Sequence, residues 1–265
     1  MEWIYGKTIV ITGASSGIGR ALTELFIREY NCRVIGIGQS KEKMDNLIQE
    51  LNYQKEAFRP KIFDVSSPDE WKTFSEELLA NDVSVDILVN NAGIMPVFDQ
   101  ALNLSEEEIK RCFDVNFHSV RYGIEAMLPI LRKSMMPGIV NISGAAALVS
   151  LPGMGIYGAT KAALKAYTES MIEELGREMY IAYACPGLVR TDLLRNQEAN
   201  GKKRWIRFMS TTPEKMAKKI VNKIVGQKSR MILGKDAHFM NFTAKHFPVL
   251  GLKFYESILK SPKGN

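Results

Sequence analysis

The chain has little of the material that several classes of protein require. Its 265 residues include only three cysteines, Cys32, Cys112 and Cys185, which lie far apart and form no Cys-x-x-Cys pair. This spacing argues against a disulfide framework or a zinc site, so we expect three small buried side chains in a reducing compartment. No run of about 18 apolar residues is present, which excludes a membrane-spanning helix. Because the amino terminus also lacks a signal-peptide layout, we expect a cytoplasmic location.

The composition is that of an ordinary globular protein, with 46% hydrophobic and 24% charged residues. It excludes a disordered chain and a collagen. The net charge of +6 is uneven, because residues 194–265 hold 16 Lys and Arg against 4 Asp and Glu. A basic tail can attract an anionic cofactor, an acidic lipid surface or nucleic acid, whereas the simplest interpretation is a solvated basic face. No nucleic-acid-binding motif accompanies it, so we expect no nucleic-acid partner.

Short runs rich in β-branched residues alternate with helical patterns over the first 190 residues. This alternation predicts an α/β fold with a doubly wound parallel sheet and helices on both faces. Ligands bind such sheets at the carboxyl ends of the strands. Without repeats or linkers we expect one domain, 1–265, in which 193–265 form a variable lid and a basic, aromatic extension. The predicted strands are 8–12, 33–37, 61–64, 86–90, 138–142 and 181–185, and the predicted helices are 17–30, 41–51, 68–80, 105–133 and 157–176.

A glycine-rich loop, Thr12-Gly13-Ala14-Ser15-Ser16-Gly17-Ile18-Gly19, follows the first predicted strand. Its glycines are spaced GxxxGxG and let the backbone approach a pyrophosphate. The next helix begins there, and its unpaired N–H groups and dipole favour anions. A plain strand-to-helix turn is the alternative. The position after the first strand of an α/β pattern favours a nucleotide site.

Further motifs follow in a fixed order, and together with the loop they resemble the short-chain dehydrogenase/reductase family over about residues 6–192. The resemblance implies a Rossmann-type fold, a nicotinamide cofactor and interconversion of a secondary alcohol and a ketone. It also implies a homodimer or homotetramer. The motifs are Asp64-Val65, Asn90-Asn91-Ala92-Gly93, Asn116, Tyr157-Gly158-Ala159-Thr160-Lys161, and Pro186-Gly187 with Thr191.

The resemblance also implies a role for each matching position. Asn116 would support a water that relays protons to Lys161, and Asn90 would be structural. Thr191 also fits the N-cap of a following helix. The cofactor would be bound by Gly13, Ser15, Ser16, Gly17, Ile18 and Gly19 in the loop, by Asp64 and Val65 at the adenine, by Asn91, Ala92 and Gly93 at the adenosine and ribose, and by Pro186, Gly187, Val189 and Thr191 toward the nicotinamide.

Tyr157 and Lys161 are four residues apart, which places both side chains on one face of a helix. An alcohol substrate needs an acid/base near neutral pH, and tyrosine, with a pKa of about 10, is too weak a base by itself. A nearby ammonium group favours the phenolate and lowers that pKa. Lys161 can also hold the nicotinamide ribose hydroxyls. We therefore expect Tyr157 and Lys161 to be the reacting pair.

One position departs from the family pattern. The family usually has a serine 13 residues before the tyrosine, and here that position is Gly144, with Ser143 beside it. A shifted backbone that presents Ser143 to the substrate is the favoured interpretation. Ser150 or a water could replace the hydroxyl, or turnover could be weak or specialised. A cofactor-binding regulatory protein with little catalysis is therefore the alternative function.

The segment after the second strand reads the ribose 2′ position. Here Gln39, Ser40 and Lys41 follow the strand and no acidic residue stands among them. A carboxylate would repel a 2′-phosphate, whereas these side chains can donate hydrogen bonds to one. The sequence therefore predicts a preference for NADP(H) over NAD(H).

Basic and bulky apolar residues alternate over 201–209, and aromatic residues alternate with lysines over 239–260. The first segment suits a lid over a large apolar substrate, such as a steroid-like, retinoid-like or fatty acyl compound. The second is expected to pack on the body or on a second subunit, with a membrane surface as the less favoured alternative.

Overall fold

Seven parallel strands form one sheet in the computed structural model, in the order β3-β2-β1-β4-β5-β6-β7. The structure describes residues 2–96, 101–149, 151–193 and 210–259. The strand order reverses between β1 and β4, and ligands bind such sheets outside the carboxyl ends at this point. The strands are β1 (Thr8–Thr12), β2 (Arg33–Gly38), β3 (Phe58–Ile62), β4 (Ile87–Asn90), β5 (Gly138–Ile142), β6 (Tyr180–Pro186) and β7 (Arg230–Leu233).

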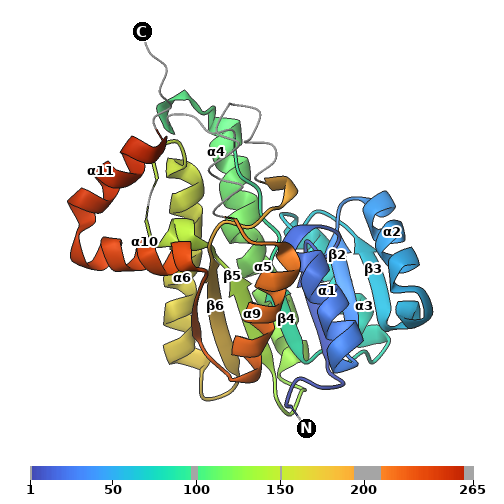
Figure 1. The fold of residues 1–265 in the computed structure, drawn as a ribbon. Coiled ribbons are helices and arrows are strands. Elements are labelled where there is room, and N and C mark those ends of the chain that lie inside the picture. Colours follow the sequence, from blue (N-terminus) through green and yellow to red (C-terminus); the bar gives the residue numbers. More distant parts are fainter. Residues whose placement is uncertain (1, 97–100, 150, 194–209, 260–265) are drawn as a thin grey trace.

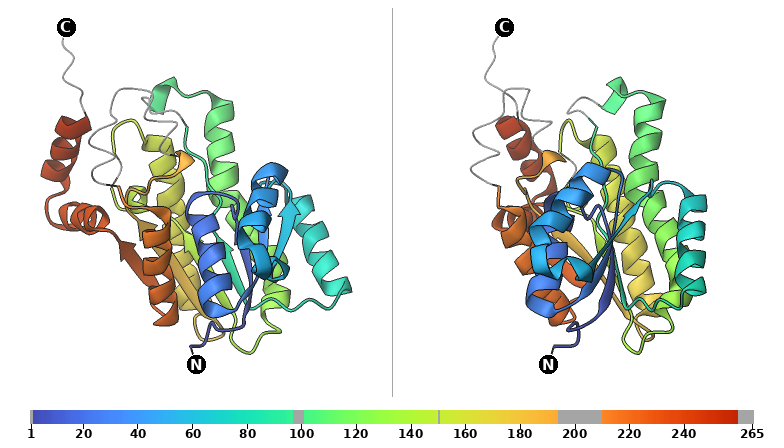
Figure 2. Two further views of the ribbon diagram at one scale, coloured as in Figure 1. Left: turned by 45° about the vertical axis from the view of Figure 1, so that its right-hand side comes forward. Right: turned by 90° about the vertical axis from the view of Figure 1, so that its right-hand side faces the viewer.

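Helices cover both faces of the sheet, which confirms the predicted α/β class (Figures 1 and 2). One face carries α1 (Gly17–Tyr30), α2 (Lys41–Leu51) and α9 (Pro213–Val225). The other carries α3 (Pro68–Ala80), α5 (Ser119–Leu131) and α6 (Gly155–Leu175). The other α-helices of the described residues are α4 (Glu106–Phe113), α10 (Lys235–His246) and α11 (Pro248–Leu259), and the last two lie at the left of Figure 1, with α10 packed against β7.

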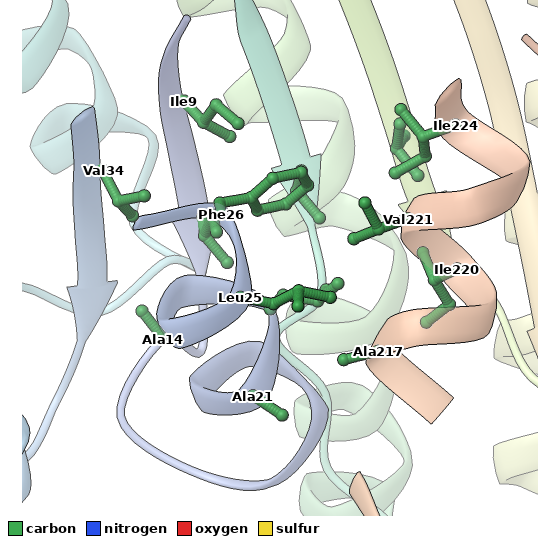
Figure 3. Packing of buried hydrophobic residues seen from close by; sticks show 14 of the residues in the cluster. Ile9, Ala14, Ala21, Leu25, Phe26, Val34, Ala217, Ile220, Val221 and Ile224 are labelled. Atoms are coloured by element: carbon green, nitrogen blue, oxygen red, sulfur yellow. The ribbon is translucent and has the colours of Figure 1, made fainter. Parts of the chain in front are cut away.

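Two apolar layers hold the helices on the sheet. Side chains alternate along each strand, so Ile9 and Ile11 of β1 enter one layer and Val10 enters the other. In the first layer Phe26 of α1 lies among residues of α9 that include Ile220, and both are fully buried (Figure 3). The sheet is thus buried on both sides, which fixes the positions of its strand ends.

The structure corrects three predicted elements. The third strand is Phe58–Ile62 rather than 61–64, and it contains Pro60, which an edge strand tolerates because it has only one neighbour. The predicted helix 105–133 is divided by a π-helical turn, Asp114–His118. The tail supplies α9 and β7, two elements that the sequence did not predict, so part of the expected extension belongs to the sheet and core, while the expected lid segment 201–209 lies outside the described residues.

The structure also locates the three thiols. Cys32, Cys112 and Cys185 are all buried and free. Within the described ranges, no helix combines the length and apolar character needed to cross a bilayer.

Candidate active site

The glycine loop connects β1 to α1 at the carboxyl edge of the sheet. Ser16, the N-cap of α1, makes no side-chain capping bond, and the first turn of α1 contains no acidic residue. Its N–H groups are therefore suited to an external anion. A side-chain carbon at Gly19 would collide with the Gly13 carbonyl oxygen, so the loop folds tightly only with glycine there. Ile18 packs against the core below, leaving the loop backbone to face a ligand.

The turn after β4 is clamped onto this loop. The backbone N–H groups of Asn91 and Ala92 both donate to Thr12 Oγ1 over 2.9 Å. The Asn91 side chain donates to the Thr12 carbonyl oxygen, also over 2.9 Å. Asn90 instead donates to Asn141 of β5 over 2.8 Å and is fixed inside the sheet. The two loops expected to bind the adenosine half of a cofactor are therefore one rigid unit.

Asn116 lies in the π-helical turn between α4 and α5 and is fully buried. Its Oδ1 accepts a 2.8 Å hydrogen bond from Ile94 N, and its Nδ2 donates to Ile94 O and to Thr160 Oγ1. A side-chain carbon at Gly93 would lie 3.2 Å from both Asn116 Oδ1 and Lys161 Nζ. Three segments far apart in sequence therefore meet at Gly93. π-Helical turns inside helices are frequent at functional sites.

Tyr157 and Lys161 lie in the first two turns of α6, as their spacing predicts. The Lys161 Nζ atom is 5.8 Å from the Tyr157 ring centroid and donates to the Ile142 carbonyl oxygen over 3.3 Å. Burial lowers the pKa of Lys161 to about 8. Burial also raises the pKa of Tyr157, and the nearby Cys112 thiol adds to this. The described residues therefore do not produce the expected lowered pKa of the tyrosine, because burial disfavours both charged forms.

The structure does not bring Ser143 to the tyrosine hydroxyl. Ser143 is buried, and its Oγ donates to the Lys161 carbonyl oxygen over 2.7 Å. Gly144, at φ 127°, faces the tyrosine instead, since a side-chain carbon there would lie 3.7 Å from Tyr157 Oη. The expected backbone shift is therefore absent from this geometry. Ser150, the other candidate hydroxyl, lies outside the described residues.

Asp64 occupies the rim of the site just beyond β3. Its carboxylate accepts hydrogen bonds from Ser66 N and from Arg111 Nη2, both over 2.9 Å. Burial acts to raise the pKa of Asp64, but the hydrogen bonds from Ser66 and Arg111 outweigh it and hold the pKa below its ordinary value. Val65 beside it is buried, and its carbonyl accepts from Trp71 Nε1. Asp64 is thus charged and held by side chains of this chain.

Gln39 and Lys41 are exposed at the end of β2, where the ribose 2′ position was expected. Ser40 caps α2 by accepting a hydrogen bond from a backbone N–H in its first turn. A hydroxyl that accepts keeps its own proton, so Ser40 can still donate. Ser15 Oγ would lie 3.2 Å from a side-chain carbon at Gly38. The region therefore gathers donors from both the glycine loop and the end of β2.

The loop after β6 is held by a residue that the sequence did not single out. Pro186 ends β6, and Leu188 N donates to the Asp236 carboxylate over 2.6 Å. A side-chain carbon at Gly187 would collide with that carboxylate, so glycine is needed for the contact. Because β7 was not predicted, Asp236 was not recognised as a residue that follows a strand end.

The same loop is held from its other side by Thr211. Val189 pairs with Thr211 as an isolated parallel bridge, and Arg190 N donates to Thr211 O over 2.9 Å. The Thr191 methyl group would lie 2.9 Å from a side-chain carbon at Gly17. Val189 and Thr191 are therefore fixed next to the glycine loop, where a nicotinamide ring would complete the site.

The doubly wound sheet, the clamped glycine loop and the buried tyrosine and lysine define a dinucleotide-dependent oxidoreductase. A family model described as short chain dehydrogenase matches residues 7–202. The chain belongs to this family of oxidoreductases, which act on CH–OH and C=O groups.

Similar proteins include an 11-beta-hydroxysteroid dehydrogenase 1A of Arabidopsis thaliana, 33% identical over 206 residues. That match covers 76% of this chain and 57% of the relative. Among solved structures, a 3-ketoacyl-(acyl-carrier-protein) reductase from Brucella melitensis complexed with NADH has a TM-score of 0.77 at 23% identity, covering 86% of this chain and 96% of that one. A serine dehydrogenase complexed with NADP+ has a TM-score of 0.72 at 26% identity, covering 81% and 87%.

Proposed function

We propose that the protein is an NADP(H)-dependent oxidoreductase that interconverts a secondary alcohol and a ketone on a bulky apolar substrate. The observation that carries this proposal is the convergence of Tyr157, Lys161 and Asn116 beside Gly93, opposite the glycine loop. A bound nicotinamide would supply or accept the hydride. The groups needed to hold it and to move the accompanying proton come from different parts of the chain.

Tyr157 Oη gives its proton to the ketone oxygen in reduction and takes it back in oxidation. The Lys161 ammonium stabilises the phenolate that results, and its buried position makes the interaction strong. Since burial holds the pKa of Lys161 at about 8, the ammonium form still predominates at neutral pH. Asn116 fixes the Ile94 backbone and so keeps the floor of the site in place.

The NADP(H) preference rests on the end of β2. Gln39 and Lys41 are exposed, Ser40 retains a donor, and Ser15 Oγ lies nearby. A 2′-phosphate would accept hydrogen bonds from these groups and would meet the positive charge of Lys41. The serine dehydrogenase binds NADP+ and the ketoacyl reductase binds NADH, so the fold admits both.

The apolar substrate class rests on the side chains that follow Gly144. Ala145 and Val149 form a separate apolar cluster with Ala237 and Met240 of α10, and Leu151 packs against it. An apolar cluster directly after Gly144 suits a fused-ring or acyl substrate better than a small polar one. The steroid dehydrogenase and the ketoacyl reductase are named for substrates of these two kinds. A homo-oligomer and a cytoplasmic location stay predictions from the sequence.

Thermal unfolding with NADPH, NADP+, NADH and NAD+ tests the cofactor. A ligand at 100 times its dissociation constant adds about 2.7 kcal/mol, which raises the melting temperature by a few degrees. We expect the larger rise with the phosphorylated forms; a larger rise with NADH would contradict the preference. Tyr157→Phe should then lower ketone reduction at least about 100-fold while NADPH binding stays unchanged.

A cofactor-binding regulatory protein with weak turnover is the second candidate. It is favoured by one observation, the absence of a side chain on Gly144 beside the tyrosine hydroxyl. Loss of one such donor lowers turnover by about 10²–10³ in other enzymes. Tight NADPH binding without turnover over a broad panel of ketones would support this candidate instead.

A further inference from the structure

The last two helices expose apolar side chains to solvent. Elsewhere in the described chain the exposed large apolar residues are scattered, whereas here six fall within fourteen residues and are 45% to 65% exposed. They lie on α10, on α11 and at the junction between them, at the left of Figure 1. We call these six the C-terminal apolar surface: Phe239, Phe242, Phe247, Val249, Leu250 and Leu252.

The charges around this surface are almost all positive. Lys245 and Lys253 are exposed on the same two helices. The only acidic residue in 235–253 is Asp236, and its carboxylate accepts the hydrogen bond from Leu188 N. The sequence adds Glu256 within α11, and Lys260 and Lys263 after it. Exposed aromatic and aliphatic side chains therefore stand among cations with no competing surface carboxylate from 235–253.

We propose that the C-terminal apolar surface docks on an anionic lipid bilayer. Apolar and aromatic side chains enter the boundary between headgroups and acyl chains, while lysines beside them bind acidic headgroups. Exposed apolar side chains beside lysines therefore suit the surface of an anionic bilayer. Neither helix among the described residues is able to cross the bilayer, so the contact is peripheral.

The charges also argue against a second copy of this chain as the occupant. A two-fold contact brings the same patch together from both subunits. Lys245 and Lys253 of both subunits would then gather at one apolar contact, where like charges repel and no carboxylate from 235–253 is free to pair with them. An acidic lipid surface instead supplies the opposite charge.

The docking surface is joined to the active site. Ala237 and Met240, on the inner side of α10, pack in one cluster with Ala145 and Val149, which follow Gly144. Docking would therefore place the wall of the substrate site close to the bilayer, where an apolar substrate is concentrated. This last consequence rests on the proposed function, whereas the docking itself does not.

Vesicle flotation tests the docking with the full-length protein. Vesicles of phosphatidylcholine alone are compared with vesicles that also contain phosphatidylglycerol, at low and high salt. We expect binding to the anionic vesicles, weakened by salt, and little binding to neutral ones. Absence of binding to anionic vesicles at low salt would overturn the proposal.

Substitutions then test which residues make the contact. Phe242→Asp with Leu250→Asp should weaken binding more than about tenfold, since each substitution removes an exposed apolar side chain that the bilayer would bury. Lys245→Glu with Lys253→Glu should weaken it by at least about fivefold per lysine. Met135→Asp is the matched control, because Met135 is 96% exposed far along the chain from α10. An equal loss with Met135→Asp would contradict the assignment.

Two further measurements separate the alternatives. We expect every variant to keep the melting temperature of the wild type, and this result would exclude unfolding as the cause of lost binding. The lipid proposal would be overturned by two results together. The wild type would form a dimer in solution and fail to bind vesicles, and the double variant Phe242→Asp with Leu250→Asp would dissociate that dimer. The surface would then be assigned to a second copy of the chain. Turnover of a water-soluble ketone should be unaffected by these variants, so failed turnover with intact docking counts only against the proposed function.

Discussion

The Ser143 hydroxyl donates a hydrogen bond to the Lys161 carbonyl oxygen over 2.7 Å. The bond joins the end of β5 to the second turn of α6, the helix that carries the reacting pair. In this geometry Ser143 is a structural link of the site, and we expect it not to act as a donor to the substrate.

Replacement of Ser143 distinguishes a structural role of its hydroxyl from a catalytic one. Ser143→Ala should lower the free energy of unfolding by about 1 kcal/mol, since one buried hydrogen bond is lost. Turnover should stay within about threefold of the wild type, because the hydroxyl does not face the substrate. Urea unfolding and ketone reduction measure the two effects. A tenfold fall in turnover with unchanged stability would return Ser143 to the catalytic group.

Gly144 offers the complementary experiment. Among the described residues, a side-chain carbon there meets Tyr157 Oη alone, at an ordinary contact distance of 3.7 Å. Gly144→Ser should therefore place a hydroxyl beside the reacting oxygen and raise turnover at least about tenfold. Because φ is 127°, it should also cost about 1–3 kcal/mol of stability. Gly144→Ala carries the same strain without the hydroxyl, so equal activity in the two variants would refute the effect.

The buried charge of Lys161 should lower the free energy of unfolding. Burial lowers its pKa from 10.5 to about 8, so the unfolded chain holds this proton more tightly than the folded one. Charge on Lys161 therefore opposes folding fully below pH 8, and the cost fades as the pH rises from 8 to 10.5. Lys161→Met should raise the free energy of unfolding at pH 7 by up to about 3 kcal/mol while abolishing turnover.

Urea unfolding from pH 7 to 10 checks this prediction. The gain from Lys161→Met should shrink steadily above pH 8. Lys72→Met, at an exposed lysine, is the control and should show no such trend. A gain that is independent of pH would mean that better packing, not the removed charge, stabilises the variant.

Asp236 should position the loop that follows β6. Asp236→Ala removes the acceptor of the Leu188 N–H and should weaken NADPH binding about tenfold or more, the scale of one lost charge-assisted hydrogen bond. Asp236→Asn keeps an acceptor oxygen of the same shape and should restore most of the affinity. Cofactor fluorescence titration measures both. Equal losses in the two variants would show that the charge, rather than the hydrogen bond, matters.

The bounds of α3 were predicted to the residue, and two independent features of its sequence explain why. α3 combines its apolar spacing with the Ser67 cap and Pro68 at the first position, and its predicted and observed bounds agree. β7 has only four residues and lies in a strongly basic stretch, so it gave no comparable signal. The division of 105–133 was missed because a π-helical turn adds a residue without breaking the apolar pattern.

Among the site residues too, local relations could be predicted from the sequence and long-range contacts could not. Tyr157 and Lys161 were found because four residues on a helix fix their relation locally. The contact between Asp236 and Leu188 spans 48 residues and depends on an unpredicted strand, so no local pattern announces it. The direction of the Ser143 hydroxyl depends on the backbone of Gly144, whose φ of 127° is open to glycine and cannot be read from spacing.

The bridge between Val189 and Thr211 closes the chain into a loop whose two ends are fixed to the body. Because the bridge holds both ends, we expect that lengthening the segment between them costs little free energy and leaves the sheet unaltered. β6 on one side and α9 on the other supply the anchors. We expect that exchanging 192–209 with the corresponding segment of another family member changes the substrate preference and leaves the sheet and the reacting pair unaltered.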